Sequence, residues 1–229
     1  MTKRGTDLPF ALPATTPAAR ARARRIDDAL ANAHPDAHCE LNWGQPHELL
    51  FATILSAQCT DVAVNRATES LFSAFPTVEN FAQASPEMIG KHIKTIGLHR
   101  NKAKFLHGSA CLLLENHQGE VPQTLEDLVA LPGVARKTAN VVLGNAFGLN
   151  VGVVVDTHVS RLSTRFGLTT ASTPLGIEKD LMALFPRERW CMLSHRMIFH
   201  GRRVCKARHG RCQEDPLCQR YCSEAASVE

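Results

Sequence analysis

The sequence of 229 residues predicts an all-α fold, and three observations lead to this prediction. Apolar residues recur every three or four positions through most of the chain, which is the spacing of a helix with one buried face. Most of these segments begin with Ser, Thr, Asp or Pro, residues that start helices. Only residues 151–155, Val-Gly-Val-Val-Val, resemble a strand, and one strand alone has no partner for its backbone groups. We therefore expect a buried extended linker there, and about nine or ten helices elsewhere.

Start signals and apolar stripes place the individual helices. Pro46 suits the first turn of a helix over residues 47–56, which is apolar on nearly every side and is expected in the core. Asp61 is a candidate cap, Ser-Pro-Glu at 85–87 starts another helix, and residues 124–127 match a capping box. The remaining helices are expected over residues 26–33, 101–116, 135–146, 156–166, 174–185 and 187–200.

Composition and charge narrow the class of protein. The 44% apolar and 21% charged content is typical of a globular chain. No stretch has the roughly 18 apolar residues that a membrane span needs, and the N-terminus lacks the apolar segment of a signal peptide. We therefore expect a cytoplasmic protein without a membrane partner. The net charge of +4 reflects the first 25 residues, where six basic residues face one acid. Residues 1–19 are expected to form a disordered basic leader.

A nine-residue segment from Leu131 to Ala139, Leu-Pro-Gly-Val-Ala-Arg-Lys-Thr-Ala, predicts a tight hairpin between two helices. Proline presets a turn and Gly133 permits a positive φ. The second helix would then offer backbone N–H groups to a phosphate without reading base sequence. Leu131, Gly133 and Val134 are therefore candidate DNA contacts, and an ordinary helix–helix corner is the alternative.

Two residues at or beyond this hairpin are candidates for chemistry. Lys137 falls in the first turn of the second helix, where the helix dipole and partial burial would favour the uncharged, nucleophilic amine. A solvated lysine that contacts phosphate is the alternative. Asp156 follows the Val-rich linker, with His158 and Arg161 one turn away. It is either a helix cap or a carboxylate that activates an amine and stabilises a sugar cation.

Four cysteines near the C-terminus are separated by six, five and three residues; they are Cys205, Cys212, Cys218 and Cys222. In a reducing compartment such a group predicts metal ligation rather than disulfides. Zinc sites usually contain closely spaced cysteine pairs, and here no pair has a two-residue gap. Four thiolates within one short segment favour an iron–sulfur cluster, with zinc as the alternative.

Two segments without any acidic residue predict a basic surface that binds along the phosphates of DNA. The first segment, residues 88–114, contains Lys91, Lys94, Arg100, Lys102 and Lys104. The second segment, residues 189–213, contains Arg189, Arg196, Arg202, Arg203, Lys206, Arg208 and Arg211. Arg208 and Arg211, inside the cysteine segment, are candidate DNA contacts. A solvated charged face is the alternative.

Together these residues resemble the endonuclease III family, the helix–hairpin–helix DNA glycosylases with AP-lyase activity. The resemblance runs from about residue 24 to the cysteines. Its motifs stand in family order: residues 49–58, Thr60-Asp61, Ile96-Gly97-Leu98, the hairpin, Val-Asp-Thr-His at 155–158, and the four cysteines. It implies two helical domains with a DNA-binding cleft between them. Residues 39–149 would carry the hairpin, and residues 20–38 with 150–229 would carry a 4Fe-4S cluster.

The resemblance also implies an activity in base excision repair. A monomer of the bacterial cytoplasm, associated with the nucleoid, would act on double-stranded DNA that contains oxidised pyrimidines or abasic sites. Lys137 would attack C1′ and form a Schiff base, with Asp156 activating it, and β-elimination would cut the strand 3′ to the site. The other implied roles fall to residues that enter the stack or line the damaged-base pocket: Gln58, Leu98 and His99 in the duplex, Thr157 and His158 in the pocket.

Two departures from the family pattern and three alternatives accompany this hypothesis. Ala135 stands where the family has a glycine, so φ at this position must be negative. The cysteine spacing of the family is six, two and five residues; here it is six, five and three, so the middle ligand is displaced. A mismatch adenine glycosylase would lack a lysine at position 137. An alkylated-base glycosylase would need Asp156 but not Lys137. A non-catalytic DNA-binding module would use only the hairpin.

Overall fold

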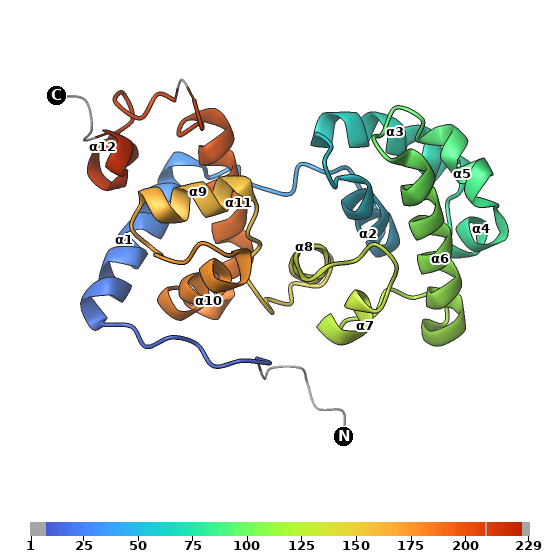
Figure 1. The fold of residues 1–229 in the computed structure, drawn as a ribbon, viewed down its shortest axis with the longest axis horizontal. Helices are drawn as coiled ribbons and strands as arrows, with labels where there is room; N and C mark the ends of the chain where they lie inside the picture. Colours follow the sequence, from blue (N-terminus) through green and yellow to red (C-terminus); the bar gives the residue numbers. More distant parts are fainter. Residues whose placement is uncertain (1–7, 209, 226–229) are drawn as a thin grey trace. The chain divides into compact units, whose positions relative to one another are not determined.

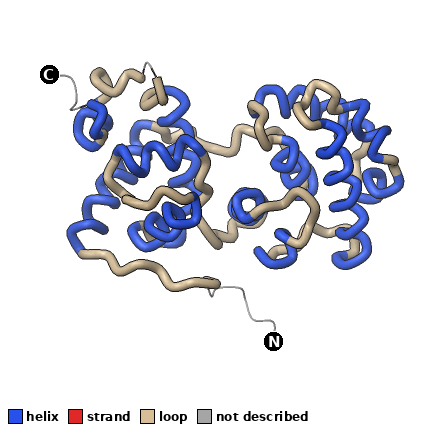
Figure 2. The backbone as a smooth tube through the Cα atoms, in the orientation of Figure 1, coloured by secondary structure: helices blue, strands red, loops and turns tan. Residues whose placement is uncertain are grey.

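The computed structural model describes residues 8–208 and 210–225. These residues form helices joined by loops and contain no strand, as the tube in Figure 2 shows. They divide into two compact units. The first, which we call the hairpin unit, is Cys39–Leu149, and the second, the cysteine unit, combines the described residues up to His38 with those from Asn150 onward. None of the helices described here combines the length and the apolar character needed to cross a membrane.

Seven helices build the hairpin unit (Figure 1): α2 (Pro46–Leu55), α3 (Asp61–Ala74), α4 (Val78–Gln83), α5 (Pro86–His92), α6 (His99–His117), α7 (Leu125–Val129) and α8 (Arg136–Ala146). Helix α6 packs against α4 and α5, and α2 packs against α8. Every residue of α2 from Leu49 to Leu55 is buried, which confirms the expected central position of this helix. The rings of Phe51 and Phe81, 4.6 Å apart between centroids, join α2 to α4 in the core.

Several helix starts in the hairpin unit follow the sequence signals. Ser85 and Thr124 cap α5 and α7, because each side chain accepts the backbone N–H three residues later. At α3 the cap is Thr60, whose hydroxyl accepts from the N–H of Ala63, so Asp61 is the first helical residue rather than the cap.

In the cysteine unit the first helix begins at Pro17 rather than at residue 26, and the helix expected from residue 187 begins at Trp190. The described chain also has more helices than expected, because α4 and α12 (Pro216–Tyr221) were not predicted, and each is only six residues long. Such helices are too short to show a periodic apolar pattern.

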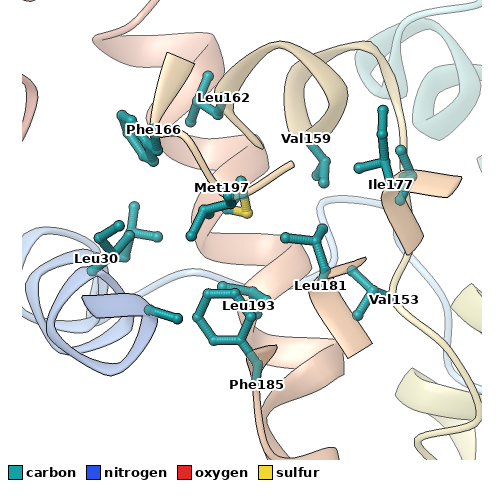
Figure 3. Close-up of a cluster of buried hydrophobic side chains, with 14 of the residues drawn as sticks. Leu30, Val153, Val159, Leu162, Phe166, Ile177, Leu181, Phe185, Leu193 and Met197 are labelled. Atoms are coloured by element: carbon teal, nitrogen blue, oxygen red, sulfur yellow. The ribbon is translucent and has the colours of Figure 1, made fainter. Parts of the chain in front are cut away.

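The cysteine unit contains α1 (Pro17–Ala33), α9 (Thr157–Arg165), α10 (Pro174–Leu184), α11 (Trp190–Arg203) and α12, with single 3₁₀ turns η1 (Arg187–Arg189) and η2 (Ser223–Ala225). Its core gathers side chains from all five helices and the segments between them, and Figure 3 shows part of it, including Leu30, Phe166, Leu181 and Met197. The linker over residues 151–155 is extended and largely buried, as expected. Its Val154 N–H donates to the Ser194 hydroxyl at 3.0 Å.

Residues 8–19 differ from the disordered leader expected over residues 1–19. Helix α1 already begins at Pro17, capped by the Thr16 hydroxyl. Leu8, Phe10 and Leu12 are partly buried against the core of the cysteine unit. The apolar side chains of this Pro- and Ala-rich segment therefore hold it on the unit. Residues 1–7 lie outside the described residues.

Candidate nucleic-acid interface and metal centre

Residues 130–135 form the tight turn that the sequence predicts between α7 and α8. Gly133 has φ +77°, and the N–H of Val134 donates to the carbonyl of Leu131 at 3.1 Å. Ala135 has φ −93° and ψ 169°, so this position satisfies the requirement for a negative φ. The first N–H groups of α8 have no acceptor within their own helix, because a helix leaves its first four donors unpaired. The turn therefore offers an anion-binding edge at the start of α8.

Helix α6 supports this turn from behind. The Ser109 hydroxyl donates to the carbonyl of Pro132 at 3.0 Å. A Cβ atom at position 133 would lie 2.8 Å from Phe105 Cδ2, so glycine is needed for the close approach as well as for its positive φ. The side chains of Leu131 and Val134 are only 4% and 7% exposed and face the core of the hairpin unit. Of the three predicted contacts in this turn, only Gly133 is exposed.

A pair of glycine substitutions separates strain from steric contact at this turn. Gly133→Ala is expected to lower the free energy of unfolding by about 2–3 kcal/mol and to weaken duplex binding, because Phe105 must move as well. Gly148→Ala is the control: its φ is +67° with nothing within 4 Å of the added Cβ, so about 1 kcal/mol of backbone strain is expected. Urea unfolding measures both, and equal losses would contradict the role given to Phe105.

Lys137 and Asp156 lie in different units. Lys137 is exposed in the first turn of α8, so the partial burial expected from the sequence is absent, and its ammonium has no hydrogen-bond or ion-pair partner in the described part of the chain. Asp156 is half-buried and caps α9: its Oδ1 accepts the N–H groups of His158 and Val159, both at 2.8 Å. Capping occupies one carboxylate oxygen, which leaves the other free to receive a proton or face a cation.

His158 is held by its neighbour Arg161. Arg161 Nη2 lies 3.2 Å from His158 Nδ1 and also donates to the carbonyls of Gly201 and Cys205, both at 2.9 Å. Burial lowers the pKa of His158, the carboxylate of Asp156 opposes this shift, and the positive charge of Arg161 adds to it. His158 is half-buried, and Thr157 beside it is exposed.

Gln58 and Leu98, the two residues expected to enter a duplex, both have left-handed backbones. Gln58 has φ +57° and Leu98 has φ +59°, a region that residues other than glycine rarely adopt. Both side chains are exposed, Leu98 to 62%. Leu98 caps α6 and half-buried His99 is the first residue of that helix. A large exposed apolar side chain on a strained turn is costly in a folded protein, which indicates a functional role.

The four C-terminal cysteines meet in one buried group. Their sulfur atoms all lie within 4.8 Å of one another. The unusual spacing is explained by the short helix α12: Cys218 lies in its first turn and Cys222 follows its last residue, so the two, four positions apart, share one side of the helix. His200, Asp215 and Cys218 form a second group, of three residues, that shares Cys218 with the first. In that group Asp215 already caps α12 by accepting the Cys218 N–H at 2.8 Å, so the cysteine group is the better metal site.

The pKa values of the four thiols indicate that the group favours a bound cation. The pKa of Cys205 is lowered to about 4, because the Cys218 thiol donates to its sulfur and Arg165, 3.3 Å away, adds a second hydrogen bond. The pKa values of Cys212 and Cys222 are raised, mainly by burial, and that of Cys218 is raised mainly because its proton is shared with Cys205. One of the four cysteines can therefore ionise without a metal, whereas ionisation of all four would require a bound cation.

Two further donors reach this group. Arg165 Nη1 points at Cys205 Sγ, and His200 Nε2 lies 3.2 Å from Cys218 Sγ. His34 Nε2 in turn lies 3.0 Å from His200 Nδ1. A metal-bound thiolate only accepts, so His200 would donate to Cys218 and accept from His34. Sequence reasoning did not identify these supporting residues, since His34 comes from α1 and lies far from the cysteines in sequence.

In both acid-free segments some basic residues are exposed and others are paired or buried. In the second segment, Arg189 and Arg196 face the buried carboxylate of Asp27, at 3.5 and 3.1 Å, and so do not belong to an open phosphate surface. Arg208 and Arg211 are exposed in the described part of the loop between Cys205 and Cys212. In the first segment Lys91, Lys94, Arg100 and Lys104 are exposed. Lys102 is 3% exposed and points into the protein.

Comparison with known proteins identifies the family. Residues 51–187 match the HhH-GPD superfamily of base excision DNA repair proteins. The chain is 50% identical over 200 residues to endonuclease III of Synechocystis sp., which covers 86% of this chain and 91% of that protein. It is 46% identical over 191 residues to endonuclease III of Bacillus subtilis, covering 83% and 87%. The chain belongs to the endonuclease III family.

Solved structures agree with this assignment. A trapped covalent intermediate of endonuclease III with DNA aligns with a TM-score of 0.86 and 43% identity over 90% of this chain and 97% of that one. A thermostable thymine-DNA glycosylase, 19% identical, shares the fold with a TM-score of 0.79 over 92% of this chain and 100% of that one. The helix–hairpin–helix glycosylase fold expected from the sequence is therefore confirmed. For this endonuclease III family member, a buried four-cysteine group is a candidate metal cluster.

Proposed function

We propose that this chain is a bifunctional DNA glycosylase and AP lyase that removes oxidised pyrimidines from duplex DNA. The observation that carries the proposal is an exposed Lys137 in the first turn of the hairpin helix, in a chain of the endonuclease III family. A hairpin that binds phosphate through its backbone N–H groups brings the sugar–phosphate backbone of DNA to this lysine, whatever the base sequence. The protein is proposed to act in the cytoplasm as a monomer.

The proposed reaction begins when the Lys137 amine attacks C1′ of a nucleotide turned out of the helix. The C1′–N bond breaks and the base leaves with its electron pair and takes up a proton. The ring oxygen then departs from C1′, so that a protonated Schiff base links lysine and sugar. This iminium acidifies C2′–H: a base removes the proton, the C2′–C3′ double bond forms and the 3′ phosphate leaves. Hydrolysis of the Schiff base frees the enzyme.

Other residues are proposed to support these steps. The free oxygen of the Asp156 carboxylate would take the ammonium proton and stabilise positive charge on the sugar. Gln58 would fill the space that the extruded nucleotide leaves. Leu98 would insert as a wedge into the opposite strand, and its neighbour His99 would also contact the duplex. Thr157 and His158 would contact the damaged base. Gly133 of the hairpin and the exposed Arg208 and Arg211 would bind phosphates.

Borohydride trapping tests this function directly. The wild-type chain, a duplex with one thymine glycol and sodium borohydride should yield a covalent protein–DNA adduct, because borohydride reduces the Schiff base to a stable amine. An undamaged duplex of the same sequence is the control and should yield none. Base removal without an adduct would indicate a monofunctional glycosylase. Binding with neither base removal nor adduct would indicate a non-catalytic module and reject the proposal.

We infer that the metal centre is a 4Fe-4S cluster held by Cys205, Cys212, Cys218 and Cys222. Its support is the donor set, four thiolates with N–H donors from Arg165 and His200. When bound, such a cluster neutralises the buried thiolates and fixes the loop between Cys205 and Cys212, which carries the exposed Arg208 and Arg211. It takes no part in the bond changes described above.

Metal content distinguishes this cluster from zinc. Protein purified without oxygen should contain about four iron atoms per chain and absorb broadly in the visible range. Cys218→Ser should lose most of the iron and the colour. Cys111→Ser is the matched control, since Cys111 is a half-buried cysteine of α6 outside the group, and should retain both. A colourless wild-type protein with one zinc per chain would contradict the assignment.

A further inference from the structure

Lys102, near the start of α6, is a buried lysine whose ammonium is fully used inside the hairpin unit. Its side chain is 3% exposed. Nζ donates to the carbonyls of Leu55 at 2.9 Å and Ala57 at 2.6 Å, and lies 3.3 Å from Cys59 Sγ. An ammonium has three donors, so each has a partner. No carboxylate pairs with it among the residues that the structure describes. A buried cation that binds only backbone carbonyls and a thiol needs an explanation other than charge pairing.

The partners of this ammonium surround Gln58. Leu55 is the last residue of α2, and the N–H of Cys59 closes a turn on the carbonyl of Ser56 at 3.0 Å, with left-handed Gln58 inside that turn. The carbonyls at the end of a helix carry partial negative charge, which a cation stabilises. The Lys102 ammonium therefore caps the C-terminal end of α2 and links the residues on either side of Gln58 to α6.

The same residue is joined to the turn that presents Leu98. The backbone N–H of Lys102 donates to the carbonyl of Leu98 at 3.0 Å, beside a second bond from Asn101 at the same distance. Leu98 precedes α6 with its left-handed backbone, and its side chain is exposed. Lys102 thus bonds to the Gln58 turn through its side chain and to the Leu98 turn through its backbone, so one residue links both strained turns.

We propose that Lys102 is a positioning residue that holds Gln58 and Leu98 in fixed conformations before DNA binds. This role rests on the proposed function, in which these two side chains enter the duplex as a damaged nucleotide leaves it. Backbone turns that are already fixed do not lose conformational freedom on binding, so more of the interaction energy is available to extrude the base. Removal of a base needs this extrusion. Elimination at an existing abasic site, where no base is stacked, depends on it less.

The test compares these two reactions in one variant. Lys102→Met keeps the length and the apolar stem of the side chain and removes its three donors. In single-turnover reactions, base removal from a thymine-glycol duplex should slow by about tenfold or more, whereas elimination on a preformed abasic duplex should stay within about twofold. Lys102→Arg, a second variant that keeps the buried cation but changes its donor geometry, should shift the ratio of the two rates in the same direction.

A stability control and a double mutant separate positioning from general weakening. Leu113→Ala removes a fully buried side chain about three turns further along α6, and should lower the unfolding temperature while leaving the ratio of the two rates unchanged. Gln58→Ala should slow base removal in the wild-type chain but have little further effect in Lys102→Met, because the two residues act through the same turn.

Three results would overturn the role of Lys102: equal slowing of both reactions in Lys102→Met, a shift of the rate ratio in Leu113→Ala as large as that in Lys102→Met, or fully multiplicative effects of the Gln58 and Lys102 changes. A wild-type chain that neither removes thymine glycol nor cuts an abasic site would instead reject the proposed function, and the role of Lys102 with it. A 2-aminopurine placed beside the lesion gives an independent readout. Its fluorescence should rise on binding of the wild-type chain and rise less with Lys102→Met.

Discussion

Lys137→Ala is expected to abolish the borohydride-trapped adduct and to slow strand cutting at an abasic site by about a thousandfold or more. The reason is that the Schiff base needs a primary amine, and the adjacent Arg136 carries a guanidinium instead. Affinity for a duplex with a reduced abasic analogue should fall by less than about tenfold, since the hairpin binds phosphate through its backbone. A gel shift with labelled duplex measures both adduct and binding.

The exposure of Lys137 makes this variant easy to interpret. Substitution of an exposed side chain without a hydrogen-bond partner changes the free energy of unfolding by about 0.5 kcal/mol or less, so lost activity cannot be attributed to unfolding. Lys137→Gln, which keeps much of the side-chain length, serves as a second variant with the same expected loss. An adduct of undiminished yield in either variant would place the Schiff base on another amine.

Asp156→Asn is expected to slow base removal by about a hundredfold or more, because an amide neither takes up a proton nor stabilises a cation. The fold should be kept, since asparagine caps a helix about as well as aspartate and can still accept the N–H groups of His158 and Val159. Thermal unfolding and single-turnover base removal are the two measurements.

Asp156→Ala completes this comparison, because it removes the cap together with the charge. It should lower the free energy of unfolding by about 1 kcal/mol relative to Asp156→Asn, with a similar loss of base removal. If Asp156→Asn instead keeps wild-type activity and only Asp156→Ala loses it, then Asp156 is merely a cap for α9.

Local signals in the sequence predicted much of the fold. The start of α5 at Ser85, the capping residue of α7 and the positive φ of Gly133 depend on neighbouring residues alone, so a short segment specifies them. The meeting of the four cysteines was also predictable, because they are close in sequence, whereas the short helix that brings the last two together was not predicted.

The features that were not predicted depend on contacts between distant segments. Charge patterning groups Lys102 with its exposed neighbours, and only the packing of α6 against the end of α2 turns its side chain inward. The burial of the Leu131 and Val134 side chains likewise depends on long-range packing, and it leaves open the DNA contact predicted for the backbone of the hairpin. The pairing of Arg189 and Arg196 with Asp27 joins α1 to segments more than 150 residues away.

The division of the chain into its two units has a consequence for how the protein is made. The hairpin unit is one continuous segment, Cys39–Leu149, so it can fold once that segment has left the ribosome. The cysteine unit combines residues before and after that segment, and α1 packs on α11 and α12, which are synthesised after the hairpin unit. Helix α1 must therefore wait until the hairpin unit has been made before its buried face is covered. The four cysteines are together only after Cys222 has emerged, so a metal held by all four would be loaded after the hairpin unit has been made.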